Sequence, residues 1–403
     1  MPDISVDQFI ASATEFLDAN AERRSDARFV WGEGTDRVGM LDEKTPDQEQ
    51  AEIVEAKAWK AKEFDAGFGW ITGPTEYGGA ALHKDFDRAY RELVAQYAIP
   101  SQSPFGIGLG MVAPTILAHA IPEVRERYLR SMWRGDLIGC QLFSEPVAGS
   151  DLAGIQTKAE RDGDEWIVTG QKVWTSGAQY SDIGEIITRT SPDKPKHKGM
   201  TMLLVDMHAP GIEVRPLRQM TGGASFNEVF FDEVRVHDSH RLGDVDEGWT
   251  VALTTLMNER ASIGGGGAGV GSMSVTRFFE MAKHFGLNHD PLVRQGLADV
   301  FIRMAVARYT NLRAMEKLRA GQLPGPEMSI AKLVLTQNMQ RVNQLVGEML
   351  GPRLAADTGE WGTFAFSEMV LGTPGMRVAG GTDEVMRNII GERVLGLPKD
   401  PKP

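Results

Sequence analysis

Cysteine is nearly absent from the 403-residue sequence: Cys140 stands alone, so no disulfide can form within the chain. This scarcity suits a reducing compartment, and a cytoplasmic location is expected. The sequence has no run of 18 apolar residues, so no transmembrane helix is predicted. The N-terminal stretch MPDISVDQFIASATEFLDANAERR has early aspartates and no apolar signal core. It is expected to be a helix of the mature protein and not a targeting peptide.

Positive charge is in deficit as well. The chain has 43 lysines and arginines against 55 aspartates and glutamates, a formal net charge of −12, and no basic block long enough to form an arm. This balance argues against nucleic acid as a partner, because binding a phosphate backbone needs a basic surface. The hydrophobic content of 42% and the charged content of 24% are those of an ordinary globular protein. At this length, two or three packed units are expected.

Three regions of different character follow one another along the chain. Residues 1–137 have mostly helical periodicity, clearest in the Ala-, Glu- and Lys-rich stretch that begins at Gln48. Residues 138–246 change to short apolar strands between turn residues, and KAERDGDEWIV with its Asp-Gly pair predicts a β-hairpin. Helical patterns return over residues 247–403. The predicted order is therefore helical, β, helical.

The stretch LFSEPVAGSD, which begins at Leu142, ends an apolar strand in small and polar residues. Glycine has no side chain to block an approach, so backbone N–H groups near Ser144, Gly149 and Ser150 can come close to a flat or anionic ligand. Such a sequence is also common at ordinary strand-to-loop junctions. The stretch alone is therefore a weak indication of a ligand site.

A second stretch, GQKVWTSG, places Trp174 beside the hydroxyls of Thr175 and Ser176 near the end of another predicted strand. An indole at that point can stack on a ring, and the hydroxyls can donate hydrogen bonds to it. The alternative is a tryptophan of the core, since the chain has eight.

Together these stretches are far more specific than either alone. FSEPVAGSDLAGIQTKAERDGDEWIVTGQKVWTSG closely resembles the flavin-binding domain of the acyl-CoA dehydrogenases. The resemblance continues through GMTMLLVDMHAPGIEV, NEVFFDEVRVHDSHRLGDVDEGW and VAGGTDEVMRNIIGERVLGLP, and it is weakest in the first 60 residues. It implies an α+β multidomain fold with a helical N-terminal domain (1–137), a β-barrel-like middle domain (138–246) and a C-terminal four-helix bundle (247–403).

The resemblance also implies FAD, held between the middle and C-terminal domains. Gln295 matches a glutamine that reaches the FAD of a neighbouring subunit, and Ser150 lies near both cofactor and substrate. The positions that the resemblance assigns to the cofactor are Phe143, Ser144, Gly149, Ser150, Trp174, Ser176, Gln295, Gly381 and Thr382.

Removal of an α-proton from an acyl thioester needs a base. Many members of the family carry a glutamate immediately before the C-terminal Gly-Thr, but this chain has Gly380 there. Isovaleryl- and long-chain-type members instead place it before an arginine on a helix at the start of the C-terminal domain, and MNERASI supplies Glu259 and Arg260. The resemblance thus implies Glu259 as base and Arg260 as the cation near the substrate. The alternatives are a solvated helix glutamate and an ordinary interdomain ion pair.

Two glycine-rich stretches admit two explanations each. The four glycines 264–267 indicate either close packing or a helix loosened for a ligand. FGIGLGMVAPTI, from Phe105 to Ile116, lies where the family lines its acyl cavity. Its glycines leave room for a branched or ring-bearing acyl group, or they allow a helix of small residues to pack closely.

One position departs from the family pattern. An arginine that binds the FAD pyrophosphate across an interface is often found three residues before a Phe-Gly pair, and this chain has Ala282 there. Lys283, His284 or Arg294 are candidate replacements, and a partner chain is another source of the charge. A dimer or tetramer is expected, either homomeric or mixed.

The resemblance implies an FAD-dependent dehydrogenase that converts an acyl-CoA to the trans-2-enoyl-CoA and passes electrons to an electron-transfer flavoprotein. Two alternatives stay open. One is an acyl-CoA oxidase that uses oxygen. The other is a non-catalytic subunit or flavin-binding scaffold of a mixed oligomer.

Overall fold

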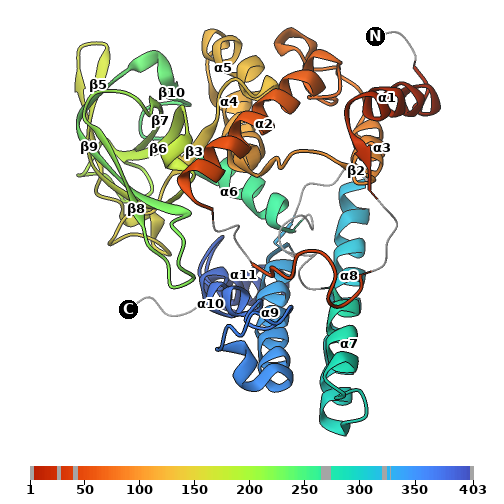
Figure 1. Cartoon of the computed structure of the whole chain (residues 1–403). Coiled ribbons are helices and arrows are strands. Elements are labelled where there is room, and N and C mark those ends of the chain that lie inside the picture. The colour runs from red at the N-terminus through yellow and green to blue at the C-terminus, as the bar shows by residue number, and fades with distance from the viewer. Residues whose placement is uncertain are drawn as a thin grey trace. The chain divides into compact units, whose positions relative to one another are not determined.

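The computed structural model describes residues 4–24, 29–39, 44–264, 274–319, 325–326 and 328–399, without the side chains of 260–264, 314–315 and 317–319. The chain divides into two compact units. Unit 1 comprises Met1–Asp26, Lys44–Arg218 and Ala224–Thr255, and unit 2 comprises Ala27–Glu43, Gln219–Gly223 and Leu256–Pro403. Figure 1 labels the helices and strands of both units.

The first part of unit 1 is helical, as the sequence predicts. Its first two helices begin at capping boxes, in which Ser5 pairs with Gln8 and Thr45 with Gln48, so each start is encoded locally. The α-helices are α1 (Val6–Asn20), α2 (Pro46–Asp65), α3 (Lys84–Val94), α4 (Ala113–His119) and α5 (Pro122–Arg134). The short elements are β1 (Glu22–Arg23), β2 (Tyr97–Ala98), η1 (Thr75–Tyr77), η2 (Ser103–Phe105) and the π-helix η3 (Gly108–Val112).

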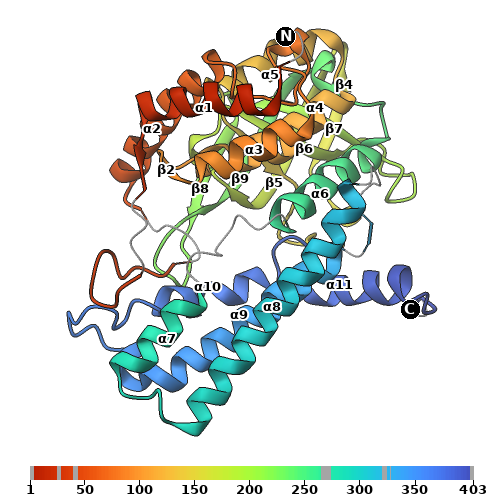
Figure 2. The same cartoon turned by 90° about the vertical axis from the view of Figure 1, so that its right-hand side faces the viewer.

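The core of these helices follows from their periodicity. On α1 the buried residues Phe9, Ala13 and Leu17 recur every four positions and form one face. This face packs in a cluster with Trp59 of α2 and Tyr90 of α3. Figure 2 shows α1 and α3 lying side by side.

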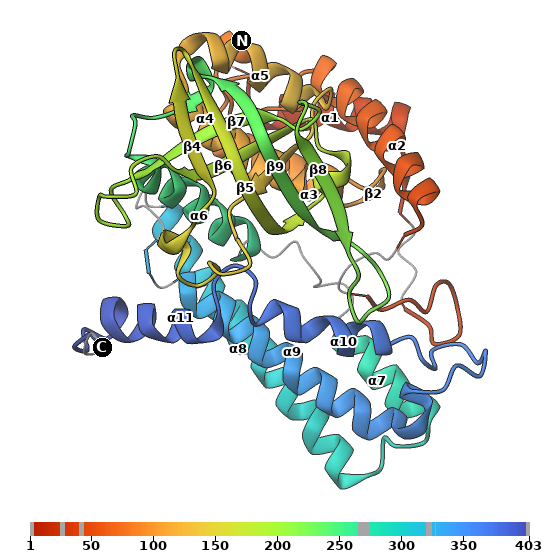
Figure 3. The same ribbon diagram turned by 90° about the vertical axis from the view of Figure 1, so that its left-hand side faces the viewer.

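The second part of unit 1 is an eight-stranded sheet. Its strands are β3 (Gly139–Leu142), β4 (Lys158–Asp162), β5 (Glu165–Ser176), β6 (Ile183–Arg189), β7 (Met200–Asp206), β8 (Ile212–Leu217), β9 (Phe226–His237) and β10 (Arg241–Leu242). The order is β10-β7-β6-β4-β5-β9-β8, with β3 paired in parallel to β6. Short helices η4 (Leu152–Gly154), η5 (Ala178–Tyr180) and η6 (Asp238–His240) connect strands. Figure 3 shows β4, β5, β9 and β8 as neighbours.

The predicted hairpin is confirmed. Strands β4 and β5 pair antiparallel, with Asp162 opposite Glu165 and Gly163 and Asp164 between them. Gly163 has φ of +64°, the left-handed conformation that such a two-residue turn requires. The turn therefore begins one residue later than the Asp-Gly pair.

The glycine-rich stretch beginning at Phe105 is used for close packing at Gly108. A Cβ built on Gly108 would lie 2.9 Å from the backbone nitrogen of Gly139 on β3, closer than such atoms approach. The π-helix therefore rests directly on the sheet because Gly108 has no side chain. Gly106 faces open space, so the two glycines serve different purposes.

Glu185, on β6, is a fully buried carboxyl group where the sheet meets the helices. Thr255, on the helix that begins at Gly248, donates a 2.6 Å hydrogen bond to Oε1. The Thr255 hydroxyl lies 2.9 Å from that of Thr115 on α4, which donates to the carbonyl of Met111. Among the described residues Oε2 has no hydrogen-bond partner. Burial raises the pKa of Glu185 to about 8, although the threonine hydroxyls oppose the shift.

Unit 2 is a helical bundle. Its helices are α7 (Val275–His284), α8 (Pro291–Arg319), α9 (Met328–Leu350), α10 (Ser367–Met376), α11 (Asp383–Ile389), η7 (Gly351–Leu354) and the π-helix η8 (Ile390–Val394). Helix α6 (Gly248–Gly264) begins in unit 1 and ends in unit 2. The apolar core of the bundle includes Phe278, Leu345 and Phe366. In Figure 2, α8 and α9 run side by side.

A segment that precedes α2 belongs to this bundle. Residues 29–39 place Trp31 in a stack with His284 at 5.4 Å and edge-on to Trp361 at 5.0 Å. Trp361 donates a 2.9 Å hydrogen bond to the carbonyl of Gly34. The sequence gives no sign that this segment packs with residues far downstream.

The helical–β–helical fold class is confirmed. The domain boundaries at 137/138 and 246/247 stay predictions.

None of the described helices is long and apolar enough to cross a membrane.

The buried Glu185 gives a prediction about stability and pH. Its pKa is about 8 in the folded protein against an ordinary 4.5, so between these values the folded state holds a proton that the unfolded state has lost. The wild-type free energy of unfolding should therefore fall as pH rises through that window. Glu185→Gln keeps the shape of the side chain but does not titrate. We expect its free energy of unfolding, relative to that of the wild type, to rise by about 2–3 kcal/mol between about pH 5.5 and pH 8. Urea unfolding at each pH measures the difference.

Glu160→Gln, at an exposed position on β4, is the matched control, and we expect its free energy of unfolding to stay within about 0.5 kcal/mol of the wild-type value. A Glu185→Gln difference that does not change with pH would show that Glu185 is not held neutral.

Candidate functional site

The structure brings together the two stretches that the sequence singles out in unit 1. The backbone N–H of Val173, next to Trp174, donates a 2.8 Å hydrogen bond to the carbonyl of Ser144. Phe143 is buried, whereas Ser144 is partly exposed. Residues 29 positions apart thus lie side by side at one place on the sheet.

A buried ion pair fixes this junction. Lys172 Nζ lies 2.8 Å from Glu145 Oε1, and the two side chains are only 0% and 4% exposed. Lys172 also donates to the carbonyl of Phe143 at 3.1 Å. Glu145 accepts hydrogen bonds from the backbone N–H groups of Gln156 at 2.6 Å and Thr157 at 2.9 Å. One pair of side chains therefore ties the end of β3, the loop that follows it, and β5.

The pair stays charged because each partner compensates the other. Burial by itself would raise the pKa of Glu145, but the charge of Lys172 and the hydrogen bonds to the carboxylate leave that pKa lowered. Burial lowers the pKa of Lys172 to about 8, although Glu145 opposes this shift. At neutral pH the carboxylate is ionised, and the ammonium is its counter-charge.

Trp174 is presented outward by a β-bulge. The register of β5 against β9 shifts between Lys172 and Thr175. Trp174 lies in this shift with φ of +62°, a conformation that bulky residues rarely adopt. A bulge re-aims the side chain, and the indole is 61% exposed, edge-on to Phe226 at 6.0 Å.

This arrangement fits a flat ring ligand. Both the left-handed backbone and the exposed indole are unfavourable for an isolated protein, and such features concentrate at functional sites. The hydroxyl of Thr175, the next residue, is buried without a hydrogen-bond partner among the described residues. Ser176 is partly exposed on the same strand. A ring stacked on Trp174 would cover the exposed indole.

The loop after β3 is held from one end. Glu145 and Ala148 exchange backbone hydrogen bonds of 2.9 and 3.1 Å, which close a tight turn. Gly149 and Ser150 follow the turn and are exposed, and a Cβ on Gly149 would meet nothing within 4 Å. Space is therefore open beside this backbone, as the sequence predicts for a ligand loop.

Unit 2 holds the other predicted contacts. Gly380 and Gly381 have φ of +64° and +88°, so the turn before α11 uses two left-handed residues in succession. Thr382 caps α11, and its hydroxyl accepts a 3.1 Å hydrogen bond from the N–H of Val385. Gln295 is exposed on α8.

The predicted base and its neighbour lie near the end of α6. Glu259 is partly exposed and takes part in interactions with neighbouring residues. Arg260 belongs to the same helix, but its side chain lies outside the described part of the chain, as do glycines 265–267. The assigned roles of Glu259 and Arg260 stay predictions.

The departure at Ala282 has a clear structural basis. Ala282 is 1% exposed in the bundle core, where an arginine would not fit without displacing neighbours. Of the proposed replacements, Lys283 pairs with Glu280 at 2.7 Å and His284 stacks on Trp31. Arg294 is exposed on α8, next to Gln295, and donates to the carbonyl of Asn288 at 3.3 Å.

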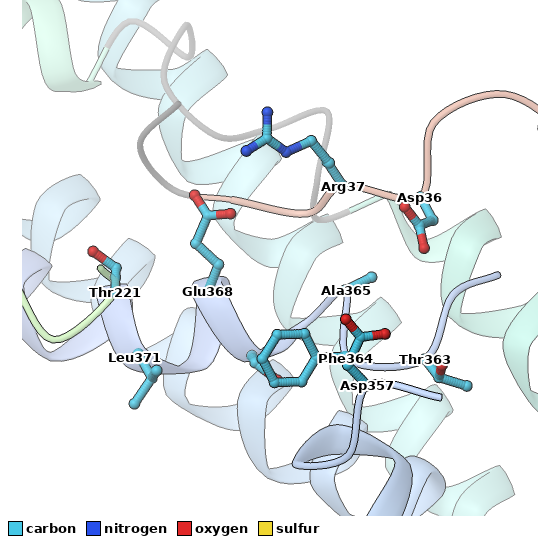
Figure 4. A pocket seen from close by; sticks show the side chains of 10 residues that line it. Asp36, Arg37, Thr221, Asp357, Thr363, Phe364, Ala365, Glu368 and Leu371 are labelled. Atoms are coloured by element: carbon cyan, nitrogen blue, oxygen red, sulfur yellow. The ribbon is translucent and has the colours of Figure 1, made fainter. Parts of the chain in front are cut away.

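A cavity of about 370 Å³ lies elsewhere in unit 2. Figure 4 shows Asp36 and Arg37 on the segment 29–39 and Glu368 and Leu371 on α10. Its lining includes three carboxylates, those of Asp36, Asp357 and Glu368, and none of the residues that the sequence predicts for a site. Arg37 and Glu368 both have interaction partners, so neither is a free charge awaiting a ligand.

Sequence reasoning missed the ion pair that supports the predicted contacts. Glu145 and Lys172 both stand inside the two quoted stretches, two positions from Phe143 and Trp174 respectively. A usable signal was present, because a charged residue within an apolar strand is expected to be buried only with a partner.

Comparison with known proteins assigns all three regions. Residues 39–136, 140–234 and 246–395 match the families described as acyl-CoA dehydrogenase, N-terminal, middle and C-terminal domain, respectively. Acyl-CoA dehydrogenase IpdE1 of Mycobacterium tuberculosis is 34% identical over 364 residues, which cover 89% of this chain and 92% of IpdE1. Acyl-CoA dehydrogenase FadE34 of the same organism is 41% identical over 291 residues, which cover 71% of this chain but only 39% of FadE34.

A solved structure agrees with these matches. The ChsE4–ChsE5 complex from Mycobacterium tuberculosis is similar with a TM-score of 0.71 and 25% identity, over 99% of this chain and 100% of that chain.

The buried pair gives a prediction for stability. Lys172→Met leaves the Glu145 carboxylate buried without its cation, and we expect a loss of about 3–5 kcal/mol in the free energy of unfolding. The double variant Glu145→Gln/Lys172→Met removes both charges and should lose less than the single variant. Chemical denaturation of the three proteins measures both differences.

Lys158→Met is the matched control on the neighbouring strand. Lys158 pairs with Glu160 at 2.7 Å, close to the 2.8 Å of the buried pair. This second pair lies in solvent, with side chains 51% and 64% exposed. Its loss should cost less than about 1 kcal/mol. Equal losses at Lys158 and Lys172 would contradict the structural role of the buried pair.

Proposed function

Because the chain belongs to the acyl-CoA dehydrogenase family, a family of flavin-dependent oxidoreductases, we propose that it binds FAD and oxidises an acyl-CoA to the trans-2-enoyl-CoA. The enzyme class follows from the family. The identity of the cofactor as FAD, the acyl group and the electron acceptor are parts of the proposal. We propose an electron-transfer flavoprotein as acceptor and a cytoplasmic location.

The observation that carries the proposal is the presentation of Trp174. A buried ion pair locks the ends of β3 and β5 together, and a bulge then holds the indole outward on a left-handed backbone. Fixing a large aromatic side chain in solvent is useful to a protein that stacks it against a planar group. The isoalloxazine ring of FAD is such a group, and bound FAD supplies the acceptor for the hydride that leaves the β-carbon.

The residues of this chain then have separate roles. Phe143, Ser144, Trp174 and Ser176 form the proposed flavin-facing surface of unit 1, with Gly149 and Ser150 at the loop beside it. In unit 2, Gly381 and Thr382 contact the cofactor, and Gln295 reaches the FAD of a neighbouring subunit. These assignments rest on the residue-by-residue resemblance to the family and, for all of them except the buried Phe143, on at least partial exposure of the residue.

Glu259 is the proposed base. A carboxylate can take the α-proton of an acyl thioester when the thioester carbonyl is polarised and the site excludes water. The position fits because Gly380, where many family members carry the base, has no side chain. Arg260 is the proposed cation beside the base or the substrate, and Ser150 the proposed contact to the acyl-CoA.

One experiment tests the cofactor and the base together. Wild-type protein should retain flavin absorbance through gel filtration, and anaerobic mixing with straight, branched and steroid-type acyl-CoAs should bleach it with at least one class. Glu259→Gln keeps the size and hydrogen bonding of the side chain but cannot take a proton. We expect it to hold FAD and bind acyl-CoA, yet to bleach roughly 10²- to 10⁴-fold more slowly by stopped-flow absorbance.

Glu280→Gln, on α7, removes a helix glutamate that pairs with Lys283, and it should bleach at the wild-type rate. Near-normal bleaching by Glu259→Gln with a verified substrate would remove Glu259 from the mechanism. A protein that takes up no FAD, alone or with a partner chain, would contradict the cofactor assignment and favour a non-catalytic subunit. Rapid reoxidation of the reduced flavin by oxygen would favour an oxidase.

We also propose that α8 contacts another subunit of the same fold, either a second copy or a related chain. The exposed apolar side chains Phe301, Ile302, Val306, Tyr309 and Leu312 lie on α8. At about 100° per residue they fall on one side of the helix, and Gln295 falls on the same side. An exposed apolar face of this size is typical of an interaction surface.

Charge placed on that face should weaken the assembly. For Val306→Asp, we expect light scattering to show a shift from dimer or tetramer towards monomer, with loss of bound FAD. Glu55→Lys, at an exposed position on α2, should leave both unchanged. A wild-type monomer that retains FAD and is bleached by substrate would contradict the assembly proposal.

A further inference from the structure

Asp383 is a buried carboxylate directly after the Gly-Gly-Thr turn of unit 2, and its side chain is 1% exposed. Three donors converge on it. The Thr336 hydroxyl lies 2.8 Å from Oδ1, Lys332 Nζ lies 3.2 Å from the same oxygen, and Arg377 Nε lies 3.1 Å from Oδ2. Both oxygens of this carboxylate thus accept hydrogen bonds from the protein itself.

Helix α9 supplies two of these donors as a polar row. Lys332 and Thr336 are one turn apart, on the same face of the helix, and both are buried. Gln340 continues the row at the next turn, where its amide oxygen accepts from Arg377 at 3.2 Å when oriented towards the guanidinium. A helix that packs in a bundle would normally carry apolar residues at these positions.

The cluster closes a loop around the turn. The backbone N–H of Asp383 donates to the carbonyl of Arg377 at 3.0 Å, and Lys332 donates to that carbonyl at 3.3 Å. The five residues between Arg377 and Asp383 are therefore pinned at both ends. Within them, Gly380 and Gly381 both adopt left-handed conformations.

The electrostatics favour an ionised Asp383. Burial alone would raise the pKa of this carboxyl, but the hydrogen bonds from Thr336, Arg377 and Lys332 leave that pKa lowered. Burial lowers the pKa of Lys332, and Asp383 opposes that shift. Removing the Asp383 carboxylate would leave Lys332 and Arg377 without their shared counter-charge. The three side chains therefore depend on one another.

We infer that Asp383, with Thr336 and Lys332, is a positioning residue that sets the shape of the Gly380–Gly381–Thr382 turn for FAD. The inference rests on the proposed function, since it concerns the contact of this turn with the cofactor. The contacts to Asp383 explain why α9 has buried polar side chains on two consecutive turns, at Lys332 and Thr336.

The sharpest test removes one hydroxyl. Thr336→Val keeps the shape of the side chain and deletes a hydrogen bond to a charged group. We expect the Kd for FAD, measured by titrating FAD into full-length apoprotein, to rise roughly tenfold. Thr336→Ser restores the hydroxyl and should restore the wild-type Kd. Asp383→Glu keeps the charge but moves it by one methylene, and it should weaken FAD binding at least as much.

Thr310→Val is the matched control, because the Thr310 hydroxyl on α8 donates to a carbonyl of its own helix. A purely structural role predicts a different pattern, in which Thr336→Val lowers the melting temperature of the apoprotein but leaves the Kd for FAD unchanged. That pattern overturns the inference and leaves the proposed function intact. A wild-type protein that takes up no FAD overturns the proposed function and this inference with it.

Discussion

The cost of burying a charge is the constraint on which the candidate residues of each unit depend. An isolated carboxylate or ammonium loses several kcal/mol when it leaves water, and a partner repays this only in one geometry. Glu145 and Lys172 meet that condition at 2.8 Å, and they also bind three backbone groups around them. A displacement of either strand end would break the compensation. The backbone that carries Ser144 and Trp174 is therefore fixed more firmly than apolar packing alone would fix it.

Three buried carboxyl groups show how the donor set decides the outcome. Glu145 and Asp383 each face at least one cation, and the pKa of each is lowered. Glu185 faces two threonine hydroxyls, and burial raises its pKa to about 8. The two ionised groups brace turns that are proposed to touch the cofactor. The neutral one lies where the sheet meets α4 and α6, where a charge would have no counter-ion.

Local signals explain what the sequence could predict. Helical periodicity marked the helices, and short apolar strands between turn residues marked the sheet, because these patterns depend on neighbours in sequence. The partners that hold the site are 27 residues apart for Glu145 and Lys172 and 51 apart for Lys332 and Asp383. No local rule pairs them. The bulge at Trp174 and the packing of residues 29–39 in unit 2 also arise only from tertiary structure. The roles of Glu259, Arg260 and the flavin contacts stay predictions.

The turn at Gly380 shows why the proposed cofactor contact and the proposed base belong to different elements. A residue with a Cβ costs about 1 kcal/mol or more in the left-handed conformation that Gly380 and Gly381 both adopt. Glycines avoid that cost, but they give the unfolded chain more conformational entropy, which is lost on folding. The turn therefore needs support from other residues. The buried cluster at Asp383 supplies this support within the same unit. A turn held in this way can offer backbone groups to a ligand but has no side chain at residue 380 to take a proton. The proposed base therefore has to come from another element, and α6, which carries Glu259, is the one that the family resemblance indicates.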